Sequence, residues 1–233
     1  MIKTDIRFRQ TLSACLCLVA TTVIGTAAWA QSASPPPLAP LGDPPIPADN
    51  QQSAAKVELG KLLFFDPRLG GDASVSCGTC HEPSQGWAFA EDISRGYPGT
   101  VHWRNSQTIV NAAYLGKQFW AGAASSHESQ ARSAARGGVA GNGESDLMEA
   151  RLALIPEYRK AFRDIFGDEW PLIKNAWRAI SAFERTLVQR DAPIDKYLDG
   201  DASALSEQQL RGKEVFECVN GAARQGSITA DRT

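Results

Sequence analysis

The run Cys-Gly-Thr-Cys-His at residues 77–81 constrains this chain more than any other feature of its sequence. A C-x-x-C-H run is the attachment pattern of c-type haem. On one helical turn both thiols reach the two vinyl groups of the porphyrin, and the adjacent imidazole is placed to ligate the iron. The pattern therefore predicts one covalently bound haem c, attached through Cys77 and Cys80, with His81 as a ligand of the iron.

Three other interpretations of the same five residues compete with haem attachment. A redox-active dithiol is expected in a thioredoxin-like βαβ context, which the surrounding sequence lacks. A structural zinc site needs a second pair of ligands, and the remaining histidines, His102 and His127, are not in such a pair. A chance match is the third interpretation, because any short motif is only a hypothesis.

The first 30 residues have the pattern of a secretory signal peptide. Lys3, Arg7 and Arg9 precede an apolar run over residues 12–28, and Ala-Trp-Ala follows at residues 28–30. A retained membrane anchor is the alternative, but serine, threonine and glycine dilute the apolar run. We expect cleavage after Ala30, a periplasmic protein and no stable membrane anchor.

The cysteines and the charge narrow the class of protein further. Of the five cysteines, Cys15 and Cys17 leave with the signal peptide, and only Cys218 accompanies the motif pair. An odd number of cysteines argues against a disulfide framework. The formal net charge of −2 gives no basic excess, so nothing in the composition suggests a nucleic-acid partner.

The spacing of apolar residues predicts an all-α fold of the cytochrome c type. Residues 31–53 are rich in proline, serine and alanine, which predicts a flexible leader. No strand-like alternation of useful length follows. Helices are expected over residues 54–65, over 146–166 with a break at Pro156, from Pro171 to Leu187, and from Ser206, capped by Gln209, to Phe216.

Several blocks beyond the haem motif resemble the bacterial di-haem cytochrome c peroxidase family, which includes the methylamine dehydrogenase maturation enzymes. The resemblance covers residues 54–217 and rests on residues 57–69, 76–81, 104–114, 118–120, 156–159 and 182–187, which follow one another in the family order. It implies an N-terminal haem domain over residues 54–200 and the start of a second cytochrome c domain, incomplete, over residues 201–233.

The resemblance also implies roles for single residues. His81 would be the proximal ligand of the peroxide-binding haem, and Trp120 would lie on the electron route between two haems. Gln130 would line the distal peroxide pocket, and Asn105 would contribute to a calcium site. By sequence alone, Trp120 is better explained as a core residue and Asn105 as a turn or cap residue, and only the family resemblance favours the functional roles.

The distal side of the haem departs from the family pattern. Some relatives have a histidine sixteen residues after the haem-binding histidine, where this chain has Tyr97. A phenolic ligand, an open site or ligation by His102 are the alternatives. Peroxide cleavage also needs a proton-transferring base. Glu144 is the first candidate for that base, and Glu128 is a weaker one.

The second haem motif of the family is not complete in this sequence. Cys218 stands where its first cysteine is expected, but Gly221 and Ala222 follow where Cys-His is required. A truncation or a disturbance of the reading frame would explain the difference. The resemblance therefore implies a peroxidase impaired by loss of one haem site.

Three functions compete on this evidence. The first is reduction of hydrogen peroxide to water, with electrons from a small periplasmic cytochrome c or cupredoxin. The second is a mono-haem electron-transfer protein without peroxidase turnover, and the third is a fragment without function. The family resemblance further implies a possible homodimer.

Overall fold

A computed structural model describes residues 37–224 of the chain. The predicted signal peptide at residues 1–30, and the predicted leader as far as residue 36, lie outside the described residues. The chain divides into two compact units, one formed by residues 37–210 and the other including residues 211–224. The first unit contains the C-x-x-C-H motif. The predicted domain boundary at residue 200 remains a prediction.

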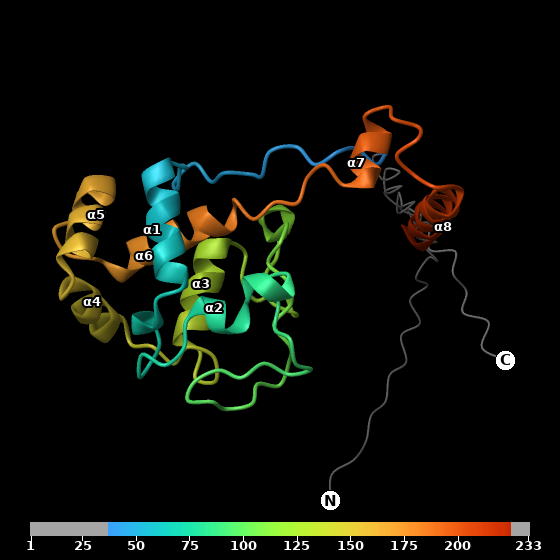
Figure 1. The fold of residues 1–233 in the computed structure, drawn as a ribbon. Coiled ribbons are helices and arrows are strands. Elements are labelled where there is room, and N and C mark those ends of the chain that lie inside the picture. The colour runs from blue at the N-terminus through green and yellow to red at the C-terminus, as the bar shows by residue number, and fades with distance from the viewer. Residues whose placement is uncertain (1–36, 225–233) are drawn as a thin grey trace, which may run out of the picture. The chain divides into compact units, whose positions relative to one another are not determined.

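The core of residues 37–210 is built around two crossing helices, α1 (Ala54–Phe64) and α6 (Ile173–Glu184) (Figure 1). They approach closely because Gly60 has no side chain. A Cβ atom at Gly60 would lie only 1.9 Å from the carbonyl oxygen of Ala179. The buried side chains around this crossing form one apolar core with Leu59, Leu63, Phe64, Trp177, Ile180 and Phe183 among its members.

Helix α3 (His127–Arg136) packs against α6 and was not among the predicted helices. Its buried apolar residues include only the small side chains of Ala131 and Ala135, so the sequence has no strong apolar stripe there. The Oγ of Ser126 accepts a hydrogen bond from the Ser129 N–H over 3.1 Å and caps the helix. This serine pair was the one local signal for the helix.

Helices α4 (Ser145–Ala153) and α5 (Pro156–Phe166) confirm the prediction of two helices separated at Pro156. Proline is favoured in the first turn because its missing N–H would be unpaired there. Glu149 of α4 holds the start of α6. One of its oxygens accepts from the Ile173 N–H at 2.8 Å, and the other accepts from Trp170 Nε1 at 3.0 Å.

The other predicted helices are confirmed, with shifted ends. Helix α1 ends at Phe64, one residue early, and α6 ends at Glu184 rather than Leu187. Helix α8 (Glu207–Arg224) extends beyond Phe216, and its predicted cap is present, since the Ser206 N–H donates to Gln209 Oε1 at 2.8 Å. The short α7 (Pro193–Leu198) was not predicted.

The connection between α1 and α3 contains only short elements: η1 (Pro67–Leu69), α2 (Cys77–Cys80), η2 (Pro83–Gln85) and η3 (Ala112–Tyr114). Within residues 37–224 there is no β-strand, only isolated bridges, so the all-α prediction is confirmed. No helix in this described range is long and apolar enough to cross a membrane. The haem motif thus lies on one short turn, supported by the helical core.

Candidate haem site

The two motif thiols lie on the single turn of α2. Its N-cap residue is Ser76, whose backbone N–H donates to Thr79 Oγ1 over 3.0 Å. Cys77 and Cys80 are half-buried free thiols, and residues three apart on a helix share a face. Burial, and then the charge of Glu184, raise the pKa of Cys77 to about 12, and burial also raises the pKa of Cys80. Both thiols are therefore protonated and free of disulfides, with Cys80 Sγ donating to the Arg95 carbonyl at 3.5 Å, and both could form thioether bonds to one porphyrin.

The imidazole of His81 is oriented by a backbone carbonyl. Its Nδ1 lies 3.2 Å from the carbonyl oxygen of Trp87. A carbonyl can only accept, so Nδ1 carries the proton and Nε2 keeps the lone pair that an iron ion needs. Burial lowers the pKa of His81, although the carbonyls of Trp87 and Gln107 favour the charged form. The imidazole is therefore held as a neutral ligand.

A tight turn brings the Trp87 carbonyl to this position. Trp87 has a left-handed backbone with φ of 61°, which is uncommon for a residue with a bulky side chain. Its N–H donates to the carbonyl of Glu82 over 2.9 Å and closes the turn. The Trp87 ring meets Phe64 and Phe183 edge to face, each with ring centroids 5.8 Å apart. One residue thus anchors the loop in the core and orients the imidazole.

Helix α2 also packs closely against the aromatic side chains of the core. Phe65 meets Phe64 edge to face at 5.1 Å, and its ring lies over Gly78 of the motif. A Cβ atom at Gly78 would lie 2.5 Å from the nearest atom of that ring. The small residue between the two cysteines lets the motif approach the core closely. These features fit a c-type haem: two reduced thiols on one face, a tautomer-fixed histidine and an aromatic wall.

The structure brings the Tyr97 segment next to the glycine-rich loop at residues 137–143. The Tyr97 N–H donates to the carbonyl of Ala140 over 2.7 Å, and the Gly71 N–H donates to the carbonyl of Gly141 over the same distance. The Tyr97 ring lies beside Gly71. Glu144 follows this loop directly as the exposed N-cap residue of α4. The two segments that contain the expected distal ligand and the expected distal base are therefore neighbours.

Glu128, the second candidate for the base, is already engaged in a buried ion pair. Arg185 donates from Nη2 to Glu128 Oε1, and Asn50 Nδ2 donates to the same oxygen at 2.7 Å. Burial alone would raise the pKa of Glu128, but these hydrogen bonds outweigh it and hold the pKa below its usual value. A carboxylate held in this way is a poor proton acceptor, so the structure favours a structural role for Glu128.

Two further ionisable groups are buried beside this pair. His127 is 7 % exposed, and burial, with the charge of Arg185, lowers its pKa to about 4. Glu184 is 6 % exposed, and burial raises its pKa to about 8. Within the described residues, His127 Nε2 and Arg185 Nη1 have no hydrogen-bond partner. The boundary between α3 and α6 therefore contains a titratable cluster that extends to Cys77 through Glu184.

Trp120 is a surface residue in this structure. Its side chain is 80 % exposed, with the guanidinium of Arg104 6.0 Å from the ring centroid. The alternative of a core role is therefore wrong for the described residues. Gln130 is half-buried on α3. His102 stacks on Trp103 at 4.4 Å, and its Nδ1 accepts from the Arg104 N–H over 3.2 Å.

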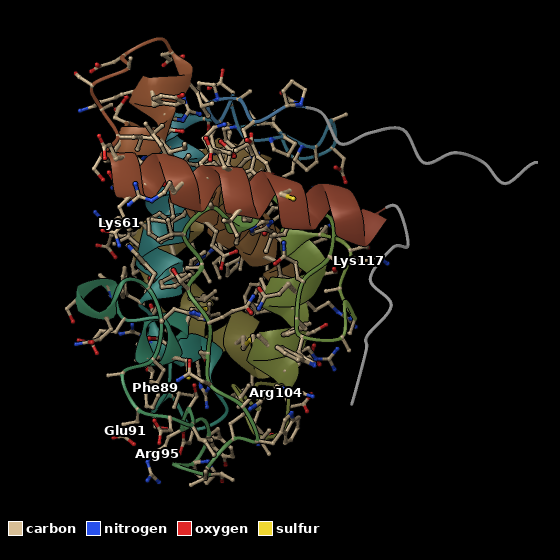
Figure 2. All side chains as sticks on the ribbon, turned by 90° about the vertical axis from the view of Figure 1, so that its right-hand side faces the viewer. Lys61, Phe89, Glu91, Arg95, Arg104 and Lys117 are labelled. Carbon is tan, nitrogen blue, oxygen red and sulfur yellow. The ribbon has the colours of Figure 1, made fainter. Side chains whose placement is uncertain are left out.

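Asn105 braces the loop after the haem motif. Its amide nitrogen donates to the carbonyls of Phe89 and Glu91. Figure 2 shows Phe89, Glu91 and Arg95 together at one edge of the unit, where Glu91 and Arg95 are 3.6 Å apart. Calcium needs six to eight oxygen ligands. Residues 37–224 contain no cluster of three or more His, Cys, Asp or Glu side chains that could hold a metal ion, so a calcium role for Asn105 remains a prediction.

A pocket of about 580 Å³ lies between α1 and α5, and none of its lining residues belongs to the haem motif. Apolar side chains such as Leu59, Leu62 and Ile165 line it, with Arg68 and Tyr158 at one side. The Tyr158 hydroxyl donates to Asp66 at 2.6 Å, and Arg68 pairs with the same carboxylate. These polar groups satisfy one another and stabilise the turn that follows α1.

The comparisons with known proteins bear on this site. The family model for di-haem cytochrome c peroxidases matches residues 54–203. The chain belongs to the di-haem cytochrome c peroxidase family. The prediction of this family is confirmed, and its model begins at the first residue of α1 and covers every residue of the candidate site.

Relatives agree with this assignment. The chain is 48 % identical to cytochrome-c peroxidase IdrP1 of Pseudomonas sp. (strain SCT), covering 91 % of this chain and 59 % of the relative. It is 51 % identical to IdrP1 of Denitromonas iodatirespirans, covering 92 % and 58 %. A solved MauG-like protein associated with microbial copper homeostasis matches with a TM-score of 0.69 and 29 % identity, covering 76 % and 52 %. The chain thus spans between half and three-fifths of the length of these proteins.

Two residues of the site were not found from the sequence. Nothing local marks Trp87 as the partner of His81, because the hydrogen bond uses a backbone atom and a left-handed turn. Glu184 lies within the family block at residues 182–187, but a glutamate near the end of an apolar helix normally lies in solvent. The roles of Tyr97, Gln130 and Glu144 remain predictions.

Proposed function

We propose that this chain binds one haem covalently through Cys77 and Cys80 and reduces hydrogen peroxide at its iron. The observation that carries the proposal is the hydrogen bond from His81 Nδ1 to the Trp87 carbonyl, combined with two free thiols on one turn. Family membership and the peroxidase names of the relatives support the same chemistry. When bound, the haem supplies an iron at which the O–O bond of peroxide can be broken.

The chain's own residues would hold the haem iron and transfer a proton between the peroxide oxygens. His81 would hold the iron through Nε2, with its tautomer fixed by the Trp87 carbonyl. Tyr97, Gln130 and Glu144 are the residues we assign to the peroxide pocket, where Glu144 would move a proton between the peroxide oxygens. The contact between the Tyr97 segment and the loop before Glu144 supports this grouping.

The proposal also includes a route by which electrons reach the haem. We assign Trp120 to the electron route, and its 80 % exposure supports a place at a contact surface. A small periplasmic cytochrome c or a cupredoxin would be the donor. Asn105 would contribute its amide oxygen to a calcium site. Export to the periplasm is proposed from the pattern of residues 1–30, which lie outside the described part of the chain.

Turnover with an external donor should be slow in this chain. Peroxide reduction consumes two electrons, and Gly221 and Ala222 stand where a second haem motif needs a thiol and an imidazole. The test is steady-state oxidation of a reduced small cytochrome by peroxide, with this chain compared with a version extended by an intact second C-x-x-C-H domain. The extended version should be much faster. Equal rates for the two proteins would contradict the proposal.

A further inference from the structure

Glu184 is a buried carboxyl group that the peroxidase chemistry does not use. It is the last residue of α6 and is 6 % exposed. Burial is the largest influence on the pKa of this carboxyl group, and it raises that pKa. The charge of Arg185, whose Nη2 pairs with Glu128, lowers the pKa of Glu184 but does not offset the burial. An isolated carboxylate in such a place is costly, so the group is poised to take up a proton.

The position of Glu184 ties it to the haem site from two directions. The charge of its carboxylate acts on the Cys77 thiol, to which the porphyrin would be bonded. The preceding residue, Phe183, packs on the ring of Trp87 at 5.8 Å, and the carbonyl of Trp87 orients His81. A charge on Glu184 would therefore act on a porphyrin bonded to Cys77 from a position shielded from water, where Coulomb interactions are strongest.

We propose that Glu184 couples reduction of the haem bound at Cys77 to the uptake of one proton. As the iron accepts one electron and goes from the ferric to the ferrous state, the Glu184 carboxylate takes one proton from solvent, and the net charge of the site stays constant. Oxidation releases the proton again. The electron comes from the small protein donor of the proposed function or, in the test, from an electrode.

The sign of the effect follows from linkage. A negative charge on Glu184 stabilises the ferric site, so it lowers the reduction potential once the carboxyl group is ionised. By reciprocity, the ferric state favours ionisation of Glu184 and the ferrous state favours its protonation. Burial raises the pKa of Glu184 to about 8, so the transition falls in the neutral to mildly alkaline range. The potential should fall as the pH rises through that range.

The charged and titratable groups that face Glu184 are few and come from four elements. Arg185 follows it at the end of α6, and α3 contributes Glu128; the charges of these two groups also act on His127 of α3. Helix α2 contributes Cys77, which thioether formation removes as an acid. Lys56 of α1 reaches the same cluster through Asn50, with its Nζ 3.1 Å from Asn50 Oδ1. His127 is neutral above about pH 4. Burial, and then the charges of Arg178 and Arg185, lower the pKa of Lys56, so the Glu184→Gln variant is what assigns a transition near pH 8 to Glu184.

The test is spectroelectrochemical titration of the exported, haem-loaded chain between pH 6 and pH 10. The wild-type potential should fall with rising pH, whereas Glu184→Gln should give a flat profile near the wild-type value at pH 6. Glu157→Gln, an exposed carboxyl group in the first turn of α5, should keep the wild-type profile. A flat wild-type profile, or an unchanged slope in Glu184→Gln, would overturn the proposal.

A second variant guards against misfolding of the first. Glu128→Gln removes a negative charge that raises the pKa of Glu184 and releases Arg185 toward it. The fall in potential should therefore move to lower pH in this variant, and an unmoved transition would contradict the coupling. The inference rests on haem binding but not on turnover. A chain without covalent haem would refute the proposed function, whereas a haem protein with a pH-independent potential would refute only the coupling.

Discussion

The backbone carbonyl of Trp87 accepts a hydrogen bond from Nδ1 of His81 over 3.2 Å. The indole ring of the same residue packs on Phe64 and Phe183 in the core. The orientation of the imidazole therefore depends on how one residue, Trp87, packs against the core. A histidine directed in this way is ready to ligate iron before a haem is attached, which reduces the cost of ordering it on binding.

Trp87→Gly should separate the two roles of this residue, which are the hydrogen bond that its carbonyl accepts from His81 and the packing of its ring on the core. Glycine suits the left-handed backbone at φ of 61° and keeps the carbonyl, but the ring contacts are lost. The Trp87 ring is partly buried against the core, so we expect the free energy of unfolding to fall by about 3 kcal/mol, the lower end for a buried aromatic. We also expect the iron spectrum to broaden as the imidazole loosens. Trp103→Gly, at a side chain 66 % exposed, is the matched control and should change stability little. Equal losses from the two substitutions would contradict the anchoring role. Urea unfolding of the haem-loaded proteins measures the free energy of unfolding of the two variants.

Covalent attachment is the next prediction. Expressed with haem-maturation machinery, the exported chain should gain the mass of one haem and keep its colour after acid-acetone extraction. Replacing both Cys77 and Cys80 by alanine should abolish the mass gain, while Cys218→Ala, at an exposed cysteine on α8, should leave it intact. Colour that the solvent extracts from the wild-type chain would refute covalent binding.

Iron ligation should depend on one histidine. His81→Gly should change the haem absorption spectrum strongly, and added imidazole should restore part of it, because the cavity left by the side chain admits the free ligand. His102→Ala and His127→Ala should leave the spectrum largely unchanged. The His102 ring is stacked on Trp103, and His127 is buried between α3 and α6. A large spectral change in His102→Ala would show that His102, not Tyr97, reaches the iron.

The buried His127 predicts a pH dependence of stability. Its pKa is about 4 in the folded chain, against an ordinary value of 6.5, so between these values only the unfolded chain binds the proton. The contribution of neutral, buried His127 to the free energy of unfolding is complete above pH 6.5 and is lost as the pH falls toward 4. In His127→Leu the free energy of unfolding should fall less steeply across this window. Glu184 acts with the opposite sign as the pH rises from 4.5 toward 8, but it is present in both proteins. Parallel curves for the two proteins would contradict the prediction.

Much of this fold could be read from the sequence because its signals are local. Apolar spacing located α1 and α6, Pro156 located the break between α4 and α5, and Ser206 with Gln209 located the start of α8. Helix α3 was missed because alanine gives little contrast between a buried and an exposed face. Observed helix ends differ from the predicted ones where a following turn competes with the last helical hydrogen bonds. Helix α1, for example, ends just before the turn that begins at Asp66.

The candidate site divides in the same way. Cys77, Cys80 and His81 were found because their chemistry requires adjacency in the sequence. The partner of His81 was not, because Trp87 contributes a backbone oxygen placed by a left-handed turn. Glu184 could not be recognised either, since its burial depends on the crossing of α6 with α1 and α3, which are distant in sequence. Local patterns therefore predicted the ligands, and tertiary packing decided their surroundings.

The most direct test of peroxide chemistry is the absorption spectrum of the ferric, haem-loaded chain before and after one equivalent of hydrogen peroxide. A peroxide-reactive iron needs an open or easily displaced position opposite His81. We expect a high-spin spectrum that changes rapidly on adding peroxide and that is lost in His81→Gly. A six-coordinate, low-spin spectrum that peroxide leaves unchanged would contradict a peroxidase and identify the chain as a mono-haem electron carrier.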